Sequence, residues 1–60
     1  MKVFLRDNKT KKKYIIKGIS TKQYQKGEYD ETLLFETIYQ LLMKHNIDDG
    51  VIIDKDGVRL

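Results

Sequence analysis

A chain of 60 residues without cysteine and with one histidine excludes disulfides, cysteine-ligated metals and histidine-rich zinc sites. No stretch approaches the ~20 apolar residues of a membrane-spanning helix or the ~7–15 of a signal peptide, which predicts one cytoplasmic domain over residues 1–60. The net charge of +3 is unevenly divided, because residues 1–26 hold nine Lys or Arg and one acid, whereas residues 27–60 hold three and eight.

The start of the chain predicts a β-hairpin. Residues 2–7 include Val3, Phe4 and Leu5, which suit a half-buried strand. The polar residues 8–11 fit a turn, and residues 12–19 fit a second strand that returns beside the first.

Alternation along these two strands assigns their faces. If Val3, Leu5, Tyr14 and Ile16 point toward the core, the basic side chains between them point outward. The reverse choice would bury four unpaired basic side chains, which is prohibitive. The outer face of the hairpin is therefore expected to carry Lys2, Phe4, Arg6, Lys13, Ile15 and Lys17.

The segment that follows the hairpin has two interpretations. Ser20 and Gln23 have the spacing of a capping box, which would start a short helix over residues 21–26. The simpler interpretation, which we favour from the sequence, is a loop that carries Tyr24 and Tyr29.

A longer helix is predicted from Glu31 to about His45. Asp30 is a good N-cap, and Asn46 suits the left-handed conformation that ends a helix. At about 100° per residue, six side chains share one arc of about 120°, as expected of a helix laid on a sheet. This arc holds Leu34, Phe35, Ile38, Leu41, Leu42 and His45.

The C-terminal segment predicts a third strand over residues 51–53. Asp54 and Gly57 suit the first and last positions of a type I turn, after which residues 58–60 either form a short fourth strand or none. The order ββαβ or ββαββ gives a two-layer α+β domain. Because one helix covers one face of the sheet, we expect the other face to lack a second layer.

Basic residues of the hairpin form the first candidate site. A sheet face with basic side chains around an aromatic ring stacks a base while its lysines contact phosphates. The alternatives are lysines that only prevent edge-to-edge aggregation, or a basic half that pairs with the acidic half of the same molecule. The predicted nucleic-acid site consists of Lys2, Phe4, Arg6, Lys9, Lys11, Lys12, Lys13 and Lys17.

Exposed apolar residues form the second candidate site, for a protein partner. Leu33 and Met43 fall outside the apolar arc of the helix, and Tyr39 lies at its edge. Tyr and Met are enriched in interfaces, and a core this small favours a partner. A regulator or inhibitor, bacterial or phage-encoded, would bind through Tyr24, Tyr29, Leu33, Tyr39 and Met43.

Nothing in the sequence predicts catalysis. Ser20 and His45 are each the single residue of their type and lie on different predicted elements, and no glycine-rich phosphate loop is present. We therefore expect a non-enzymatic binding module with no catalytic residue, no metal and no cofactor. Nucleic acid is the leading partner, a protein is the alternative, and a third possibility is a homodimer that covers the open sheet face.

Overall fold

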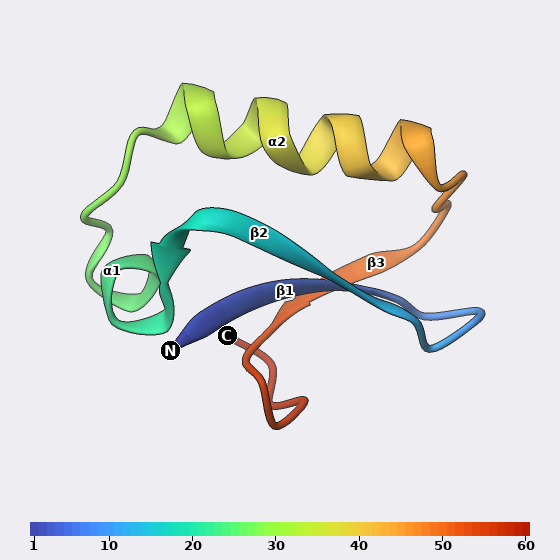
Figure 1. The fold of residues 1–60 in the computed structure, drawn as a ribbon, viewed down its shortest axis with the longest axis horizontal. Coiled ribbons are helices and arrows are strands. Elements are labelled where there is room, and N and C mark those ends of the chain that lie inside the picture. Colours follow the sequence, from blue (N-terminus) through green and yellow to red (C-terminus); the bar gives the residue numbers. More distant parts are fainter.

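A computed structural model describes residues 1–60 and shows an antiparallel sheet with a helix across one of its faces (Figure 1). The three strands have the order β2-β1-β3, so β1 is central and pairs with both others. This is the two-layer α+β class that the sequence predicts. The elements are β1 (Lys2–Asp7), β2 (Lys13–Ser20), α1 (Thr21–Lys26), α2 (Glu31–Lys44) and β3 (Gly50–Ile53).

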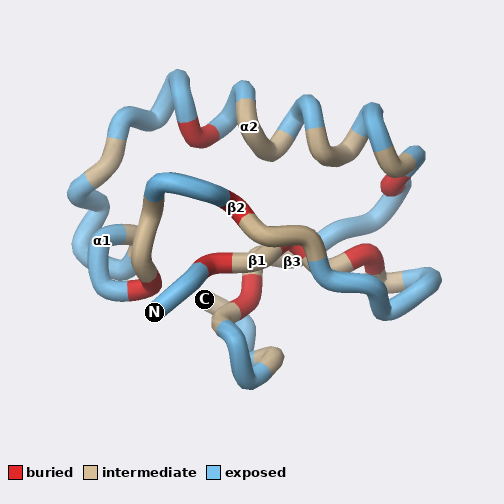
Figure 2. The backbone as a smooth tube through the Cα atoms, in the orientation of Figure 1, coloured by how far each residue is buried: buried red, intermediate tan, exposed pale blue.

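The face of the sheet below α2 carries the core that strand alternation predicts. Val3 pairs with Ile16 and Leu5 pairs with Tyr14 across β1 and β2. Val3, Leu5 and Ile16 are at most 2% exposed, and Leu34 of α2 packs against them. Figure 2 shows these buried segments where α2 and the sheet face each other. The inward assignment of these side chains is confirmed.

The opposite face of the sheet is partly covered, which corrects the expectation that it lacks a second layer. Ile15, Phe4 and Ile53 form one row across the three strands, and Ile53 is completely buried. Figure 1 shows the turn after β3 on this side of the sheet. Lys13 Nζ donates a hydrogen bond to the carbonyl oxygen of Lys55 in that turn at 3.4 Å. The face is closed at its β3 end because the chain folds back beneath it.

The capping box forms a helix, so the loop favoured from the sequence is wrong over α1. Ser20 Oγ accepts from the backbone N–H of Gln23 at 3.2 Å, and Gln23 Oε1 accepts from the backbone N–H of Ser20 at 2.9 Å. Gly27 ends the helix at a φ of 72°, where a side chain would be strained. Tyr24 and Tyr29 stack with their ring centroids 5.6 Å apart and pack against the core.

The long helix α2 begins and ends as predicted, but one of its flanks is more exposed than predicted. Asp30 Oδ1 accepts from the backbone N–H of Leu33 at 3.2 Å, and Asn46 is left-handed at a φ of 51°. Leu34 is 6% exposed, whereas Phe35 is 60% exposed and does not belong to the core. The reason is that α2 packs over β2, so the flank that carries Phe35 extends away from that strand. Neither helix has the length and apolar character needed to cross a membrane.

The two edges of the sheet differ in whether other residues cover them. Beyond β3, Asp54 donates its backbone N–H to the carbonyl of Val58, and Leu60 donates to the carbonyl of Ile52, each at 3.0 Å. The returning residues 58–60 make one isolated bridge rather than a fourth strand. They nevertheless cover the outer edge of β3, and β2 forms the other edge.

Candidate nucleic-acid interface

The outer edge of β2 presents free backbone groups. The backbone N–H of Asp7 donates to the carbonyl of Lys12 at 2.9 Å, and bonded pairs alternate along an antiparallel ladder. The backbone groups of Lys13 and Ile15 therefore point away from β1. No backbone–backbone hydrogen bond of a turn, loop or cap involves either residue. An unpaired strand edge of this kind is a ready binding surface for an extended ligand.

A groove runs between this edge and α2, and we call it the basic groove. It measures about 630 Å³, within the range of sites that hold a small molecule or a nucleotide. Its lining contains three lysines, two aromatic rings and no carboxylate. The lining residues are Lys13, Tyr14, Ile15, Lys17, Thr37, Gln40, Leu41, Lys44 and His45.

A stack of two rings closes one side of the basic groove. The rings of Tyr14 and His45 lie 3.9 Å apart at an angle of 21°. Tyr14 comes from β2, and His45 caps the C-terminus of α2. Both residues are half-buried, so their rings fix the helix to the strand while remaining accessible from the groove.

An irregularity in β2 determines where Lys17 lies. The pairing shifts from Val3 with Ile16 to Lys2 with Ser20, so the residues in between bulge from the sheet. Gly18 has a φ of 82° within this bulge. The strict alternation that assigned Lys17 to the outer face fails at this point. Lys17 instead lies on the rim of the crevice between β2 and α2.

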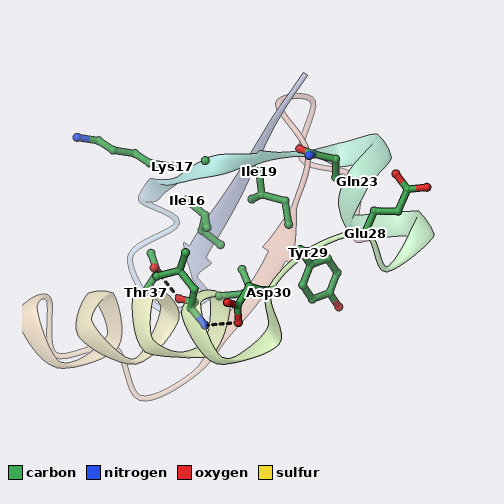
Figure 3. Close-up of a pocket in the computed structure, with 11 residues that line it drawn as sticks. Ile16, Lys17, Ile19, Gln23, Glu28, Tyr29, Asp30 and Thr37 are labelled. Carbon is green, nitrogen blue, oxygen red and sulfur yellow. Dashed lines mark hydrogen bonds between the residues drawn. The ribbon is translucent and has the colours of Figure 1, made fainter.

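A second hollow continues this crevice toward the start of α2. It shares Lys17 and Thr37 with the basic groove, and carboxylates of Glu28 and Asp30 contribute to its lining. Figure 3 shows the side chain of Lys17 extending away from this hollow. An anionic ligand is therefore favoured in the basic groove and disfavoured in the second hollow.

The predicted outer-face residues lie together but are less open than expected. Lys13 Nζ is 5.6 Å from the ring centroid of Phe4 and also bonds the turn after β3. Arg6 Nη2 donates to Asn8 Oδ1 at 3.4 Å, and Arg6 Nε is buried without a partner. Phe4 is half-buried beneath these groups. This face therefore offers less ring surface to a base than the sequence predicted, and Lys2 lies exposed at its end.

Lysines at the tip of the hairpin are exposed, and one of them is paired. Lys9 Nζ lies 2.9 Å from Asp48 Oδ2 in the one ion pair of the structure. The hydrogen bond and the charge of Asp48 raise the pKa of Lys9 above the ordinary lysine value. Lys11 and Lys12 are exposed without such a partner, and Lys11 has a φ of 66°. Pairing between the basic and acidic halves of the chain is limited to Lys9.

The predicted protein-binding residues do not form one surface. Tyr24 and Tyr29 are half-buried and pack against the core. Leu33, Tyr39 and Met43 are 61–62% exposed. Leu33 lines the second hollow on the β2 side of α2, whereas Tyr39 and Met43 lie on the far flank.

Seven groove residues escaped the sequence-based site: Tyr14, Ile15, Thr37, Gln40, Leu41, Lys44 and His45. Helical spacing puts Thr37, Gln40 and Lys44 on one flank of α2, which is a signal that the sequence contains. The strand order, which brings this flank of α2 beside the edge strand β2, could not be predicted from the sequence.

No group of three His, Asp or Glu side chains lies close enough together to hold a metal ion. No protein-family model, curated protein or solved structure matches this chain.

Proposed function

We propose that this chain is a non-enzymatic cytoplasmic module that binds single-stranded nucleic acid in the basic groove with little sequence specificity. The observation that carries the proposal is the groove lining, which combines the exposed lysines Lys17 and Lys44 with two aromatic rings and contains no carboxylate. The third lysine of the lining, Lys13, directs its Nζ to the carbonyl oxygen of Lys55 on the other face of the sheet. Basic grooves with aromatic side chains bind single strands because every base has a π-face and every nucleotide a phosphate.

Phosphates are bound by the side chains at the rim of the groove. Lys17 and Lys44 approach it from opposite walls, β2 and α2, and both are exposed. Lys11 and Lys12 extend the basic track toward the tip of the hairpin. Free backbone N–H groups along the edge of β2 add neutral donors for phosphate oxygens.

Bases are recognised by contacts that tolerate any sequence. Tyr14 and His45 offer aromatic surface, and stacking on such rings is worth about 1–3 kcal/mol per base. Thr37 and Gln40 supply hydroxyl and amide groups on the wall formed by α2. One strand edge and one helix leave room for a single strand between them, and a duplex would contact only the rim.

The C-terminus of α2 would repel an anion through its partial negative charge, but its last carbonyls are already bonded. The carbonyls of Leu41, Leu42 and Met43 accept from the backbone N–H groups of His45, Ile47 and Asn46. Lys44 adds a full positive charge at the same end of the helix. The net field in the groove therefore attracts phosphates.

A fluorescence-anisotropy titration with labelled single-stranded DNA and RNA at several salt concentrations tests this proposal. For three to four phosphates we expect a logarithmic salt slope of about −2 to −3. Lys17→Gln combined with Lys44→Gln should weaken binding at least tenfold. The matched control, Lys22→Gln with Lys26→Gln on α1, removes the same charge elsewhere and should weaken it less than threefold. Equal losses in both double variants would contradict binding in the groove.

A further inference from the structure

The crevice between β2 and α2 changes its character along its length. One end is the basic groove, which has a volume of about 630 Å³ and no carboxylate in its lining. The other end is the second hollow, which has a volume of about 130 Å³ and is lined by the carboxylates of Glu28 and Asp30. Lys17 and Thr37 line both parts and therefore mark the boundary between them.

Size and charge both close the second hollow to a nucleotide. Its volume is below the ~300 Å³ at which ligand sites begin. A phosphate placed there would lie near two like charges, which repel it. Lys17 is the one basic residue of the lining, and its side chain extends away from the hollow (Figure 3). A nucleic-acid strand in the basic groove therefore cannot continue into the second hollow.

The start of α2, which borders the second hollow, does not offset this repulsion. A helix N-terminus attracts anions through its partial positive charge and its free N–H groups. Here the helix supplies its own anions, because Asp30 Oδ1 accepts from the backbone N–H of Leu33 at 3.2 Å and Glu31 adds a carboxylate in the first turn. These side chains neutralise the positive end of the helix before a phosphate reaches it.

The opposite end of the basic groove leads to the tip of the hairpin. Figure 1 shows this tip on the same side of the molecule as the end of α2 and far from α1. Lys11 and Lys12 are exposed there, and the nearby carboxylate of Asp48 is paired with Lys9. A strand that leaves the groove toward the tip therefore meets free positive charge, whereas it meets negative charge in the other direction.

We infer that the basic groove binds the free end of a single strand, with the terminal nucleotide at Lys17 and Thr37 and the rest of the strand leaving over the hairpin tip. The inference rests on the proposed function and narrows its ligand class to strand ends. An internal segment has chain on both sides, so one side would have to pass Glu28 and Asp30 or bend sharply outward. These two carboxylates therefore determine the specificity for an end.

The length of the groove sets the length of the bound segment. Between residues 37 and 45, α2 rises about 12 Å, which accommodates about four nucleotides at ~3.4 Å per stacked nucleotide. Lys11 and Lys12 at the hairpin tip extend this to about five. The expected ligand is thus a terminal segment of about five nucleotides.

A comparison of one thymidine oligonucleotide of about 30 nucleotides in its linear and its circularised form tests the inference, since the circle has no end. Both forms carry the same internal fluorescent label, and anisotropy is measured at about 50 mM salt, where exposed charges still interact over about 10 Å. We expect the linear form to bind at least fivefold more tightly than the circle. Equal binding of the two forms would overturn the inference and leave the proposed function intact. No binding of either form would overturn both.

Glu28→Gln combined with Asp30→Asn tests the two carboxylates, and Asn at position 30 still caps α2. This double variant should bind the circle within twofold of the linear form. The matched control is Glu36→Gln with Asp56→Asn, which removes the same charge from residues that line neither hollow. It should keep the fivefold preference for the linear form. A preference that survives in the first double variant, or that is lost in the control, would overturn the inference.

Linear oligonucleotides of increasing length give an independent test. A ligand bound by its end offers the same number of sites at every length, whereas a ligand bound internally offers more sites as it grows. We therefore expect the Kd to fall up to about five nucleotides and to change less than twofold from there to about 15. A Kd that keeps falling in proportion to length would show internal binding and overturn the inference.

Discussion

Tyr14 and His45 stack with their ring centroids 3.9 Å apart, which joins the open edge strand to the end of the long helix. The pair lies between the core and the basic groove, because Tyr14 packs against the core and both rings line the groove. Structure and proposed function therefore depend on the same contact.

Removing one ring of this pair should weaken the fold. We expect His45→Ala to lower the free energy of unfolding by about 1 kcal/mol, since a stacked pair contributes about 0.5–1.5 kcal/mol beyond its buried area. His45→Phe keeps a ring and should retain most of the stability. Urea denaturation followed by circular dichroism measures both variants. Equal loss in the two variants would mean that the stack contributes nothing.

Two neighbouring residues test the orientation of α2. Leu34→Ala should cost about 2–5 kcal/mol, which is a large share of the total stability of so small a domain. Phe35→Ala should change the free energy of unfolding by about 0.5 kcal/mol or less, because the side chain is largely exposed. Thermal denaturation of Leu34→Ala and Phe35→Ala measures the two losses of stability. A larger loss for Phe35→Ala would show that the helix is rotated about its axis.

Phe35 also shows which part of the core could not be predicted from the sequence. Strand alternation predicted Val3, Leu5 and Ile16 correctly as core residues, because a half-buried strand has a period of two wherever one face is wet. The helical arc placed Phe35 in the core. Which side chains of that arc the sheet buries depends on which strand lies beneath the helix. That strand order is set by tertiary packing.

The candidate site could likewise be predicted only in part. The basic hairpin and its lysines could be read from composition, whereas the basic groove requires the edge position of β2 and the bulge at Gly18. Lys44 and His45 are distant from the hairpin in sequence, so only the packing of α2 on β2 brings them to the site. Charge patterning therefore predicted a basic site but not the location of the groove.

The positive φ of Gly18 in the bulge of β2 leads to a separate prediction. Gly18 has a φ of 82°, and a Cβ added there would meet no atom within 4 Å, so Gly18→Ala should cost about 1 kcal/mol through backbone strain alone. Gly18→Asn should cost less, because Asn tolerates the left-handed region. Melting temperatures of the two variants check this. Identical values would mean that the backbone relaxes out of the positive-φ region.

The ion pair at the hairpin tip has a defined pH dependence. The pKa of Lys9 is raised in the folded protein, so the contribution of the pair is fully present below the ordinary lysine value and is lost as the pH rises through the raised pKa. No change in this pair is expected between about pH 6 and pH 9. Asp48→Asn should return the pKa of Lys9 toward its ordinary value in an NMR titration, whereas an unchanged pKa would contradict the pairing.

Asp48→Asn should also strengthen nucleic-acid binding, because it frees Lys9 to contact a phosphate. Asp56→Asn is the control, since it makes the same charge change in the turn after β3. Anisotropy titrations at one salt concentration compare them. If both variants strengthen binding equally, net charge rather than Lys9 is responsible.

An NMR titration with a short single-stranded oligonucleotide of about eight nucleotides tests the central claim most directly, since it reports every backbone amide of the chain at once. Binding in the basic groove predicts that the largest shifts occur in residues 13–17 of β2 and residues 37–45 at the end of α2, with Phe4 and Arg6 little affected. Shifts confined to Phe4, Arg6 and Val51 on the outer face, or no shifts at low salt, would contradict it.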